Sequence, residues 1–108
     1  MAITQFVVPL QGSLADRYRH YHVLERGKIT EFSIQYEMET DGVWRAVVRY
    51  DTAHGRPHKD VLHPDGSETK EEFPHYTFAE VLALGQNDIR RHWKKYRDQY
   101  EREMRRKP

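Results

Sequence analysis

The sequence predicts an α+β fold: an antiparallel β-meander of about four to five strands with one long C-terminal helix packed on one face. Apolar and polar side chains alternate over residues 28–40 and again over 44–50, as in strands with one buried face. From residue 77 to 104 the apolar positions instead recur at helical spacing. With 108 residues, we expect a single domain over 1–108, with strands about 20–73 and the helix about 77–104.

The hairpin at Asp41-Gly42 could have either of two loop lengths, which differ in the faces they give the side chains. A two-residue loop would set Met38 opposite Arg45 and so mix apolar and polar faces. A three-residue loop at 40–42 would set Met38 opposite Trp44, with the glycine in a left-handed conformation. We therefore predict the three-residue loop, with these further pairs: Ile34 with Val48, Phe32 with Tyr50, and Glu37 with Arg45.

A two-residue turn is expected at Arg26-Gly27, before the strand at 28–40. This turn would set Tyr21 beside Phe32 and His20 beside Ser33. The polar face of the sheet would then gather a cluster of six side chains, His20, His22, Glu31, Ser33, Arg49 and Asp51.

Two segments have the character of sheet edges. Residues 3–10 are apolar and stop at Pro9 and Gly12, which is typical of an edge strand or a flap. The strand at 58–63 turns at Pro64-Asp65-Gly66 into a polar last strand. With these three residues as the loop, two favourable charge pairs face each other, Lys59 with Glu71 and Asp60 with Lys70.

The C-terminal helix has a well-marked start. Thr77-Phe78-Ala79-Glu80 matches a capping box. Gly85 lies on the apolar stripe, where it costs about 1 kcal/mol relative to alanine, so we expect close approach to the sheet there. A helix over 77–104 is about 42 Å long and a strand of about six residues spans about 20 Å. About half of the helix should therefore overhang the sheet and pack on the N-terminal segment, a second copy or a partner. The stripe comprises Phe78, Leu82, Ile89, Trp93, Tyr96, Tyr100 and Met104.

Charge is unevenly distributed along the chain. Residues 88–107 hold nine Lys and Arg against four Asp and Glu, a net charge of +5, and the remainder has a net charge of −4. A basic end on an acidic body favours an acidic partner, nucleic acid or protein, and a solvated helix face gives the same pattern. The aromatic residues in this segment fit the core better than a base-stacking surface. The candidate phosphate-contacting side chains are Arg90, Arg91, Lys94 and Lys95.

The composition limits the compartment and the chemistry. The chain has no cysteine, which excludes disulfides, zinc–thiolate sites and thiol catalysis, and fits a reducing cytoplasm. It has no apolar run near the ~20 residues of a membrane-spanning helix and no signal-peptide pattern. We expect a cytoplasmic protein that makes no use of a membrane.

Residues 49–58, RYDTAHGRPH, bring reactive side chains together where a strand gives way to a Gly/Pro loop. Cleavage of an RNA phosphodiester needs a base, an acid and cations for the developing charge. His54 and His58 are the candidate proton-transfer residues, because histidine exchanges protons near neutral pH. The other candidate roles are phosphate binding by Arg49 and Arg56, orientation of a histidine by Asp51, a lesser catalytic part for Tyr50, and substrate binding by His20 and His22.

Some of these residues also have a purely structural interpretation. Asp51 could start a turn by bonding its own backbone. Tyr50 could face the core, and Arg49 could pair with acidic residues of the strand face. The loop therefore supports function and structure about equally at the level of sequence.

The segment Asp51-x-x-His54-x-x-x-His58 also contains residue types that bind metals. On a helix the two histidines would share a face, but Gly55 and Pro57 exclude that helix. We therefore expect a site with neither metal nor cofactor, and keep a metal-dependent nuclease or hydrolase as a third interpretation.

The stretch VVRYDTAHGRPHKDVLHPDGSETK, followed by the helical NDIRRHWKKYRDQY, resembles a family of short bacterial and archaeal proteins similar to the TumE-like toxins of two-gene toxin–antitoxin systems. The resemblance covers roughly residues 20–100, and its most specific part is Arg49-Tyr50-Asp51 followed by His54. In the family's RYDNAxHH-type segment the second histidine adjoins the first, whereas here Gly55 follows His54. The resemblance implies a toxin acting on RNA or translation, with a small antitoxin protein as partner.

Two hypotheses of different classes follow. The first is a toxin-like component that acts on RNA, as a metal-independent endoribonuclease using the loop at 49–58. The alternative is a non-enzymatic module that binds protein or nucleic acid through the basic helix and the sheet edges. A homo-oligomer formed through the C-terminal helix is compatible with both.

Overall fold

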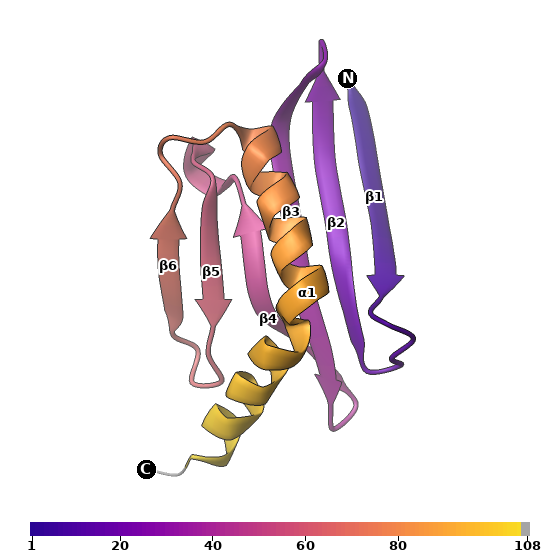
Figure 1. Cartoon of the computed structure of the whole chain (residues 1–108), viewed down its shortest axis with the longest axis vertical. Coiled ribbons are helices and arrows are strands. Elements are labelled where there is room, and N and C mark those ends of the chain that lie inside the picture. Colours follow the sequence, from indigo (N-terminus) through magenta and orange to yellow (C-terminus); the bar gives the residue numbers. More distant parts are fainter. Residues whose placement is uncertain (107–108) are drawn as a thin grey trace.

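The computed structural model describes residues 1–106, so positions 107 and 108 of the expected domain lie outside it. The strands form one sheet in chain order, each antiparallel to the next, and the helix α1 lies across one face (Figure 1). The expected α+β fold is confirmed, with six strands in place of four to five. The elements are β1 (Ala2–Pro9), β2 (Asp16–Glu25), β3 (Lys28–Thr40), β4 (Val43–Asp51), the 3₁₀ turn η1 (Ala53–Gly55), β5 (His58–Leu62), β6 (Glu68–Glu72) and α1 (Phe78–Arg105).

The additional strand comes from the N-terminal segment. β1 pairs with β2 along its whole length, from Ala2 opposite Leu24 to Pro9 opposite Arg17. β1 is an edge strand, which is where a proline can lie without removing a ladder hydrogen bond from the interior of a sheet. The edge-strand interpretation of residues 3–10 is therefore confirmed.

The core lies between the sheet and α1. Alternate residues of β3 are buried there, Phe32, Ile34, Tyr36 and Met38, as their spacing predicted. The aromatic residues of the helix belong to this core, with Trp93 and Tyr100 buried and Tyr96 partly buried against it. From α1 the buried contributors are Val81, Leu82, Gly85, Ile89, Trp93 and Tyr100.

The predicted three-residue loop between β3 and β4 is wrong. Thr40 pairs with Val43, so the loop is Asp41-Gly42 alone, with positive φ angles of 54° and 77° at its two residues. Positive φ angles at both central residues are characteristic of a two-residue hairpin turn, in which the sequence Asp-Gly is favoured. Consequently Met38 faces Arg45, and Trp44 turns to the face away from α1. There its ring is covered by the guanidinium of Arg17, 3.7 Å from the ring centroid.

A β-bulge farther along this hairpin returns the apolar side chains of β4 to the α1 side of the sheet. Glu37 is opposite Ala46 whereas Tyr36 is opposite Val48, so Val47 is an extra residue in β4. Beyond the bulge, Ile34 is opposite Tyr50, in place of the predicted Phe32. The even-numbered side chains of β4 thus face α1 after the bulge, and Arg49 and Asp51 face the opposite, open side.

The turn at Arg26-Gly27 has the predicted two residues, but a bulge follows it. Leu24 is opposite Ile29 and Val23 is opposite Glu31, which makes Thr30 the extra residue. The shift sets His20 opposite Ile34 and His22 opposite Phe32, on the α1 side of the sheet. The predicted six-residue polar cluster is therefore wrong, because the bulge moves both histidines to the other face. At the far edge of the sheet, the predicted pairs are confirmed, Lys59 with Glu71 and Asp60 with Lys70.

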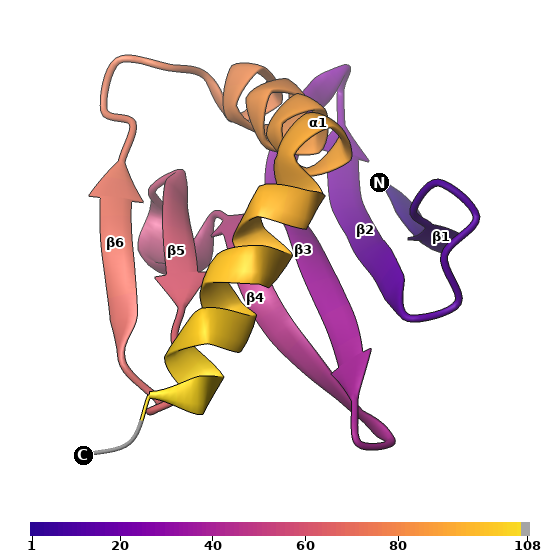
Figure 2. The same cartoon turned by 60° about the horizontal axis from the view of Figure 1, so that its bottom comes forward.

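α1 crosses the sheet diagonally and packs mainly on β3 and β4 (Figure 2). Its N-terminal capping box is confirmed, since Thr77 and Glu80 exchange side-chain to backbone hydrogen bonds of 3.1 and 2.8 Å. The expected long overhang is wrong, because β3 is longer than assumed and the diagonal path keeps Tyr100 buried. Near its end, Glu103 bonds to His63, 2.9 Å away at the end of β5. The large apolar side chains of α1 that stay exposed are Leu84 and Met104.

Polar contacts also fasten α1 to the sheet. The Asp88 carboxylate accepts hydrogen bonds from the hydroxyls of Tyr50 and Tyr96, at 2.7 and 2.6 Å, and Lys59 donates to Tyr96 at 2.7 Å. Burial raises the pKa of Asp88, but these hydrogen bonds, the contact with His92 and the charge of Lys59 more than offset it and leave that pKa lowered. Burial and Asp88 together raise the pKa of Tyr50 and of Tyr96.

Gly85 marks the closest approach between α1 and the sheet, as its place in the stripe predicted. A Cβ atom at this position would lie 2.6 Å from Cγ of Tyr50. The ring cannot swing aside freely, because the Tyr50 hydroxyl is held by Asp88. Glycine is therefore required here by packing.

The variant Gly85→Ala tests this packing. Alanine gains about 1 kcal/mol of helix propensity, but overpacking a close-packed core costs about 1–3 kcal/mol. Because the clash is with the anchored part of Tyr50, we expect the upper end of that range and a net loss of about 2 kcal/mol in urea unfolding. The control Asn87→Ala, at an exposed position of the same helix, should gain a few tenths of a kcal/mol. A stabilised Gly85→Ala protein would contradict the packing argument.

Candidate functional site

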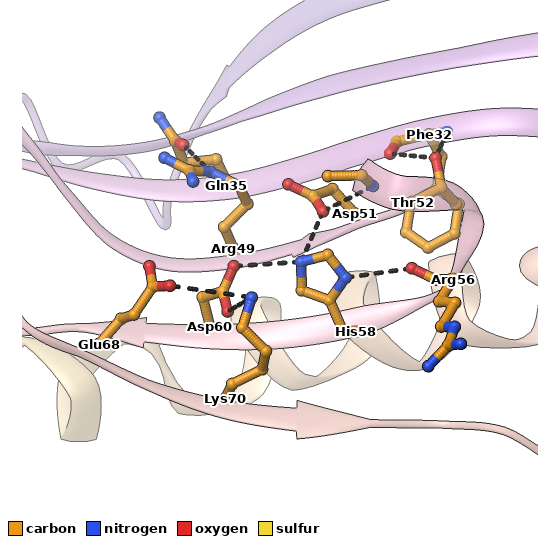
Figure 3. A network of polar contacts seen from close by, with 11 residues as sticks. Phe32, Gln35, Arg49, Asp51, Thr52, Arg56, His58, Asp60, Glu68 and Lys70 are labelled. Carbon is orange, nitrogen blue, oxygen red and sulfur yellow. Dashed lines mark hydrogen bonds and ion pairs between the residues drawn. The ribbon is translucent and has the colours of Figure 1, made fainter.

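The end of β4 and the start of β5 form a polar cluster on the open face of the sheet (Figure 3). The antiparallel register sets Asp51 opposite His58 and Arg49 opposite Asp60. Opposite residues of neighbouring strands share a face, so these four side chains all lie on the side away from α1. The Gly/Pro loop between them, which includes η1, is short enough to keep the two strands paired up to Asp51 and His58.

His58 is held between two carboxylates. Its Nε2 atom lies 2.9 Å from Oδ1 of Asp51 and 3.2 Å from Oδ2 of Asp60, while Nδ1 is 3.0 Å from the backbone carbonyl oxygen of Arg56. The side chains of His58 and Asp60 are 6% and 5% exposed, and that of Asp51 is 15% exposed. The cluster is thus nearly buried, and its opening to solvent is at Asp51.

These contacts occupy both ring nitrogens of His58. Nδ1 must carry a hydrogen, because its partner is a carbonyl oxygen that can only accept. Nε2 faces two carboxylate oxygens, so it needs a proton or another positive charge between it and them. His58 therefore has no free nitrogen with which to take a proton from a substrate.

Asp60 is only partly compensated on its other side. Nζ of Lys70 lies 3.4 Å from Oδ1 of Asp60, as an ion pair without hydrogen-bond geometry. Within residues 1–106 no group donates a hydrogen bond to this buried oxygen. A buried carboxylate oxygen in this state is costly unless a further cation or proton is bound.

Arg49 belongs to a second polar row on the same face. Its Nε donates to Gln35 at 2.7 Å, and the amide nitrogen of Gln35 donates to Glu37 at 2.6 Å. Glu37 also binds Arg17 and Arg19, at 2.7 and 2.9 Å. Arg49 is thus linked to an acidic strand residue through Gln35.

His54 lies on the surface of the loop. It is exposed, and its backbone has a φ of 64°, a left-handed conformation that histidine adopts more readily than most residues. Among residues 1–106 its ring has no hydrogen-bonding or ionic partner. Together with Asp51 it lines a groove of ≈ 450 Å³. Asp51 itself accepts a hydrogen bond of 3.1 Å from the backbone N–H of Ala53, so it starts a turn as well as binding His58.

Three of the predicted site residues lie on the α1 side of the sheet. Tyr50 is buried there and bonds to Asp88, so it contributes no group to the His58 cluster. His20 and His22 bond to each other at 2.7 Å, and Phe6 stacks on His20 at 4.4 Å between ring centroids. Burial, followed by the charge of His22, lowers the pKa of His20. Their separation from the loop follows from the bulge at Thr30.

The predicted cationic residues are also divided. Arg56 is 75% exposed beside the loop and lies 3.9 Å from Glu72, a distance typical of a weak surface pair. The remaining cations are exposed on α1, which lies across one face of the sheet (Figure 1). The register of β4 and β5 puts His58 on the other face. The loop and the basic helix therefore do not form one site. The helix residues in question are Arg90, Arg91, Lys94 and Lys95.

Asp60 and Lys70 are site residues that the sequence analysis missed. A signal was present, because His58 and Asp60 are two residues apart on a predicted strand and so share a face. The predicted pairing of Asp60 with Lys70 then places the lysine on that face as well.

The family described as Domain of unknown function (DUF7718) matches residues 1–106 of the chain. The chain belongs to this family. No curated protein and no solved structure matched the chain in the same comparisons. In residues 1–106 no helix combines the length and the apolar character needed to cross a membrane. The family description assigns no chemistry to the His58 cluster.

Single alanine variants of the two loop histidines should differ sharply in stability. His58→Ala leaves two nearly buried carboxylates without their shared donor, which we expect to cost about 3–5 kcal/mol in urea unfolding. His54→Ala removes an exposed ring without protein partners, so even with its left-handed backbone it should change the free energy of unfolding by no more than about 1 kcal/mol. Equal losses for the two variants would show that His58 is not held as the distances indicate.

Proposed function

We propose that this protein binds RNA through the exposed basic face of α1, as the RNA-directed component of a cytoplasmic toxin–antitoxin pair. The observation that carries the proposal is the pairing of charges. Several arginines and lysines of the sheet are engaged with carboxylates, for example Arg17, Arg19 and Lys70. Within the described residues, these cations of α1 have no ion-pair partner: Arg90, Arg91, Lys94, Lys95, Arg102 and Arg105.

Cations that are not neutralised by the protein itself are available for phosphates, which supply most of the affinity in nucleic-acid binding. Arg90 and Arg91 also line a groove of ≈ 620 Å³ between α1 and the end of β1, whose other walls include Val8 and the exposed Pro9. An apolar wall beside arginines suits a single-stranded nucleic acid, because bases can pack on one and phosphates on the other. The resemblance of residues 47–70 and of α1 to TumE-like toxins favours RNA over DNA.

Binding is tested by fluorescence anisotropy with a labelled single-stranded RNA and a DNA of the same sequence. Arg90→Glu/Arg91→Glu should weaken RNA binding by about tenfold or more at low salt. The slope of log affinity against log salt concentration should also fall by the amount expected for about two lost phosphate contacts. The matched control, Arg26→Glu/Lys28→Glu at the exposed β2–β3 turn, makes the same change in net charge and should leave most of the affinity. Equal losses in both variants would indicate only a net-charge effect, and preferential DNA binding would contradict the RNA assignment.

A second candidate function is RNA cleavage at the loop, favoured by the exposed His54 in its left-handed conformation. Residues held in such conformations concentrate at functional sites, and His54 shares its groove with Asp51 and Glu31. In this proposal His54 exchanges the proton and Arg49, which donates from Nε alone to Gln35, offers its remaining N–H groups to phosphate. His58 positions Asp51 and does not exchange protons with RNA.

Cleavage is tested on total RNA with purified protein in the presence of EDTA. His54→Ala should lower the cleavage rate by about 10²–10⁴-fold, the usual contribution of a general acid or base. His75→Ala, at another exposed histidine, should leave the rate unchanged. Cleavage that persists in His54→Ala would refute this second candidate. A short neighbouring gene encoding a DNA-binding protein would support the antitoxin partnership.

A further inference from the structure

We propose that Asp51, His58 and Asp60 form a binding site for one divalent transition-metal ion. The ligand atoms are Oδ1 of Asp51, Nε2 of His58 and one oxygen of Asp60, and such atoms all lie within 4.8 Å of one another. This site is on the open face of the sheet and does not depend on RNA binding by α1.

The distances fit those between neighbouring ligands of one ion. Nitrogen and oxygen ligands lie about 2.0–2.2 Å from such ions, which holds adjacent ligands about 3.0 Å apart at a right angle and about 3.4 Å apart in a tetrahedron. The distances from Nε2 of His58 to the two carboxylate oxygens, 2.9 and 3.2 Å, fall in or near this range.

The orientation of His58 is that of a metal ligand. A ligating histidine usually donates its other ring N–H to a carboxylate or a backbone carbonyl, which fixes the ring and the tautomer. Nδ1 of His58 makes this contact with the carbonyl oxygen of Arg56, at 3.0 Å. Nε2 is thereby the nitrogen directed at the carboxylates.

The unpartnered oxygen of Asp60 is an independent indication. Oδ1 of Asp60 is buried, accepts no hydrogen bond from residues 1–106 and has only the ion pair with Lys70. Two carboxylates and a neutral imidazole carry a charge of about −2, against a single lysine at the rim. A divalent cation would neutralise this group, and Asp60 could turn either oxygen toward it.

The ligand types select the class of metal. One imidazole with two carboxylates suits Mn²⁺, Fe²⁺, Co²⁺ or Zn²⁺, whereas Mg²⁺ and Ca²⁺ favour oxygen ligands alone. The partial exposure of Asp51, 15%, would give the ion its path from solvent.

The test is a titration of tag-free, EDTA-treated and dialysed protein with Co²⁺, followed by the visible absorption of the bound ion, and then displacement by Zn²⁺. We expect saturation at about one ion per chain. Mn²⁺ should broaden backbone amide signals of residues 49–60 in NMR spectra. Broadening centred on His20 and His22 would locate the ion elsewhere and overturn the proposal.

Variants separate the proposed ligands from nearby groups. Asp60→Asn and His58→Gln should each weaken Co²⁺ binding by about 100-fold or more, since a direct ligand matters more than its supporting contacts, whose loss costs about 10–100-fold. The controls Asp65→Asn and His75→Gln, at exposed loop positions, should bind as the parent protein does.

If circular dichroism shows that either buried variant is unfolded, Co²⁺ binding by Asp51→Asn tests the proposal instead. Its asparagine can still accept the Ala53 N–H bond, and its more exposed position tolerates the change. It should fold and weaken Co²⁺ binding by at least about tenfold. Unchanged binding in Asp51→Asn, or no saturable absorption in the parent protein, would overturn the proposal.

Discussion

One extra residue in β4, Val47, determines which side chains of this strand meet α1 and which meet solvent. Before the bulge, Trp44 faces the open side and Arg45 faces Met38. After it, Tyr50 turns toward α1 and Asp51 turns toward His58. Without the bulge, the strand would present these side chains to the opposite faces, because side chains alternate strictly along a strand. Both the core contact at Gly85 and the polar cluster depend on this single insertion.

The open-face position of Asp51 could be predicted from the sequence even though the loop prediction was wrong. Relative to a plain two-residue hairpin, the predicted three-residue loop and the observed bulge each shift the pairing of β3 and β4 by one residue. Both therefore put the same side chains of β4 on the same face beyond Val47, although the pairing partners differ. The face of His20 and His22 was predicted wrongly, because the bulge at Thr30 was not anticipated and no second shift compensated for it. Bulges depend on packing between distant residues, and local alternation does not reveal them. By contrast the capping box and Gly85 are signalled within one helix, and both were predicted correctly.

The sequence predicted where the candidate site lies, but not which residues form it. The loop motif drew attention to two histidines four residues apart, but η1 leaves His54 exposed and the strand pairing carries His58 inward. The partner that His58 gains is Asp60, two positions along the same strand and on the same face. Spacing along a loop says little about which side chains meet, whereas strand alternation and register decide it.

The two proposed sites lie on opposite faces of the sheet, and the structure offers no element that would couple them. Coupling between sites requires an element with two arrangements that both ligands bias. β4 is held on one side by Tyr50, packed at Gly85 and bonded to Asp88, and on the other by Asp51 bound to His58. Because β4 is fixed on both faces, we expect it to have a single arrangement. We therefore expect the proposed metal binding at His58 and the proposed RNA binding at Arg90 to be separable, so that a substitution at one site leaves the other unchanged.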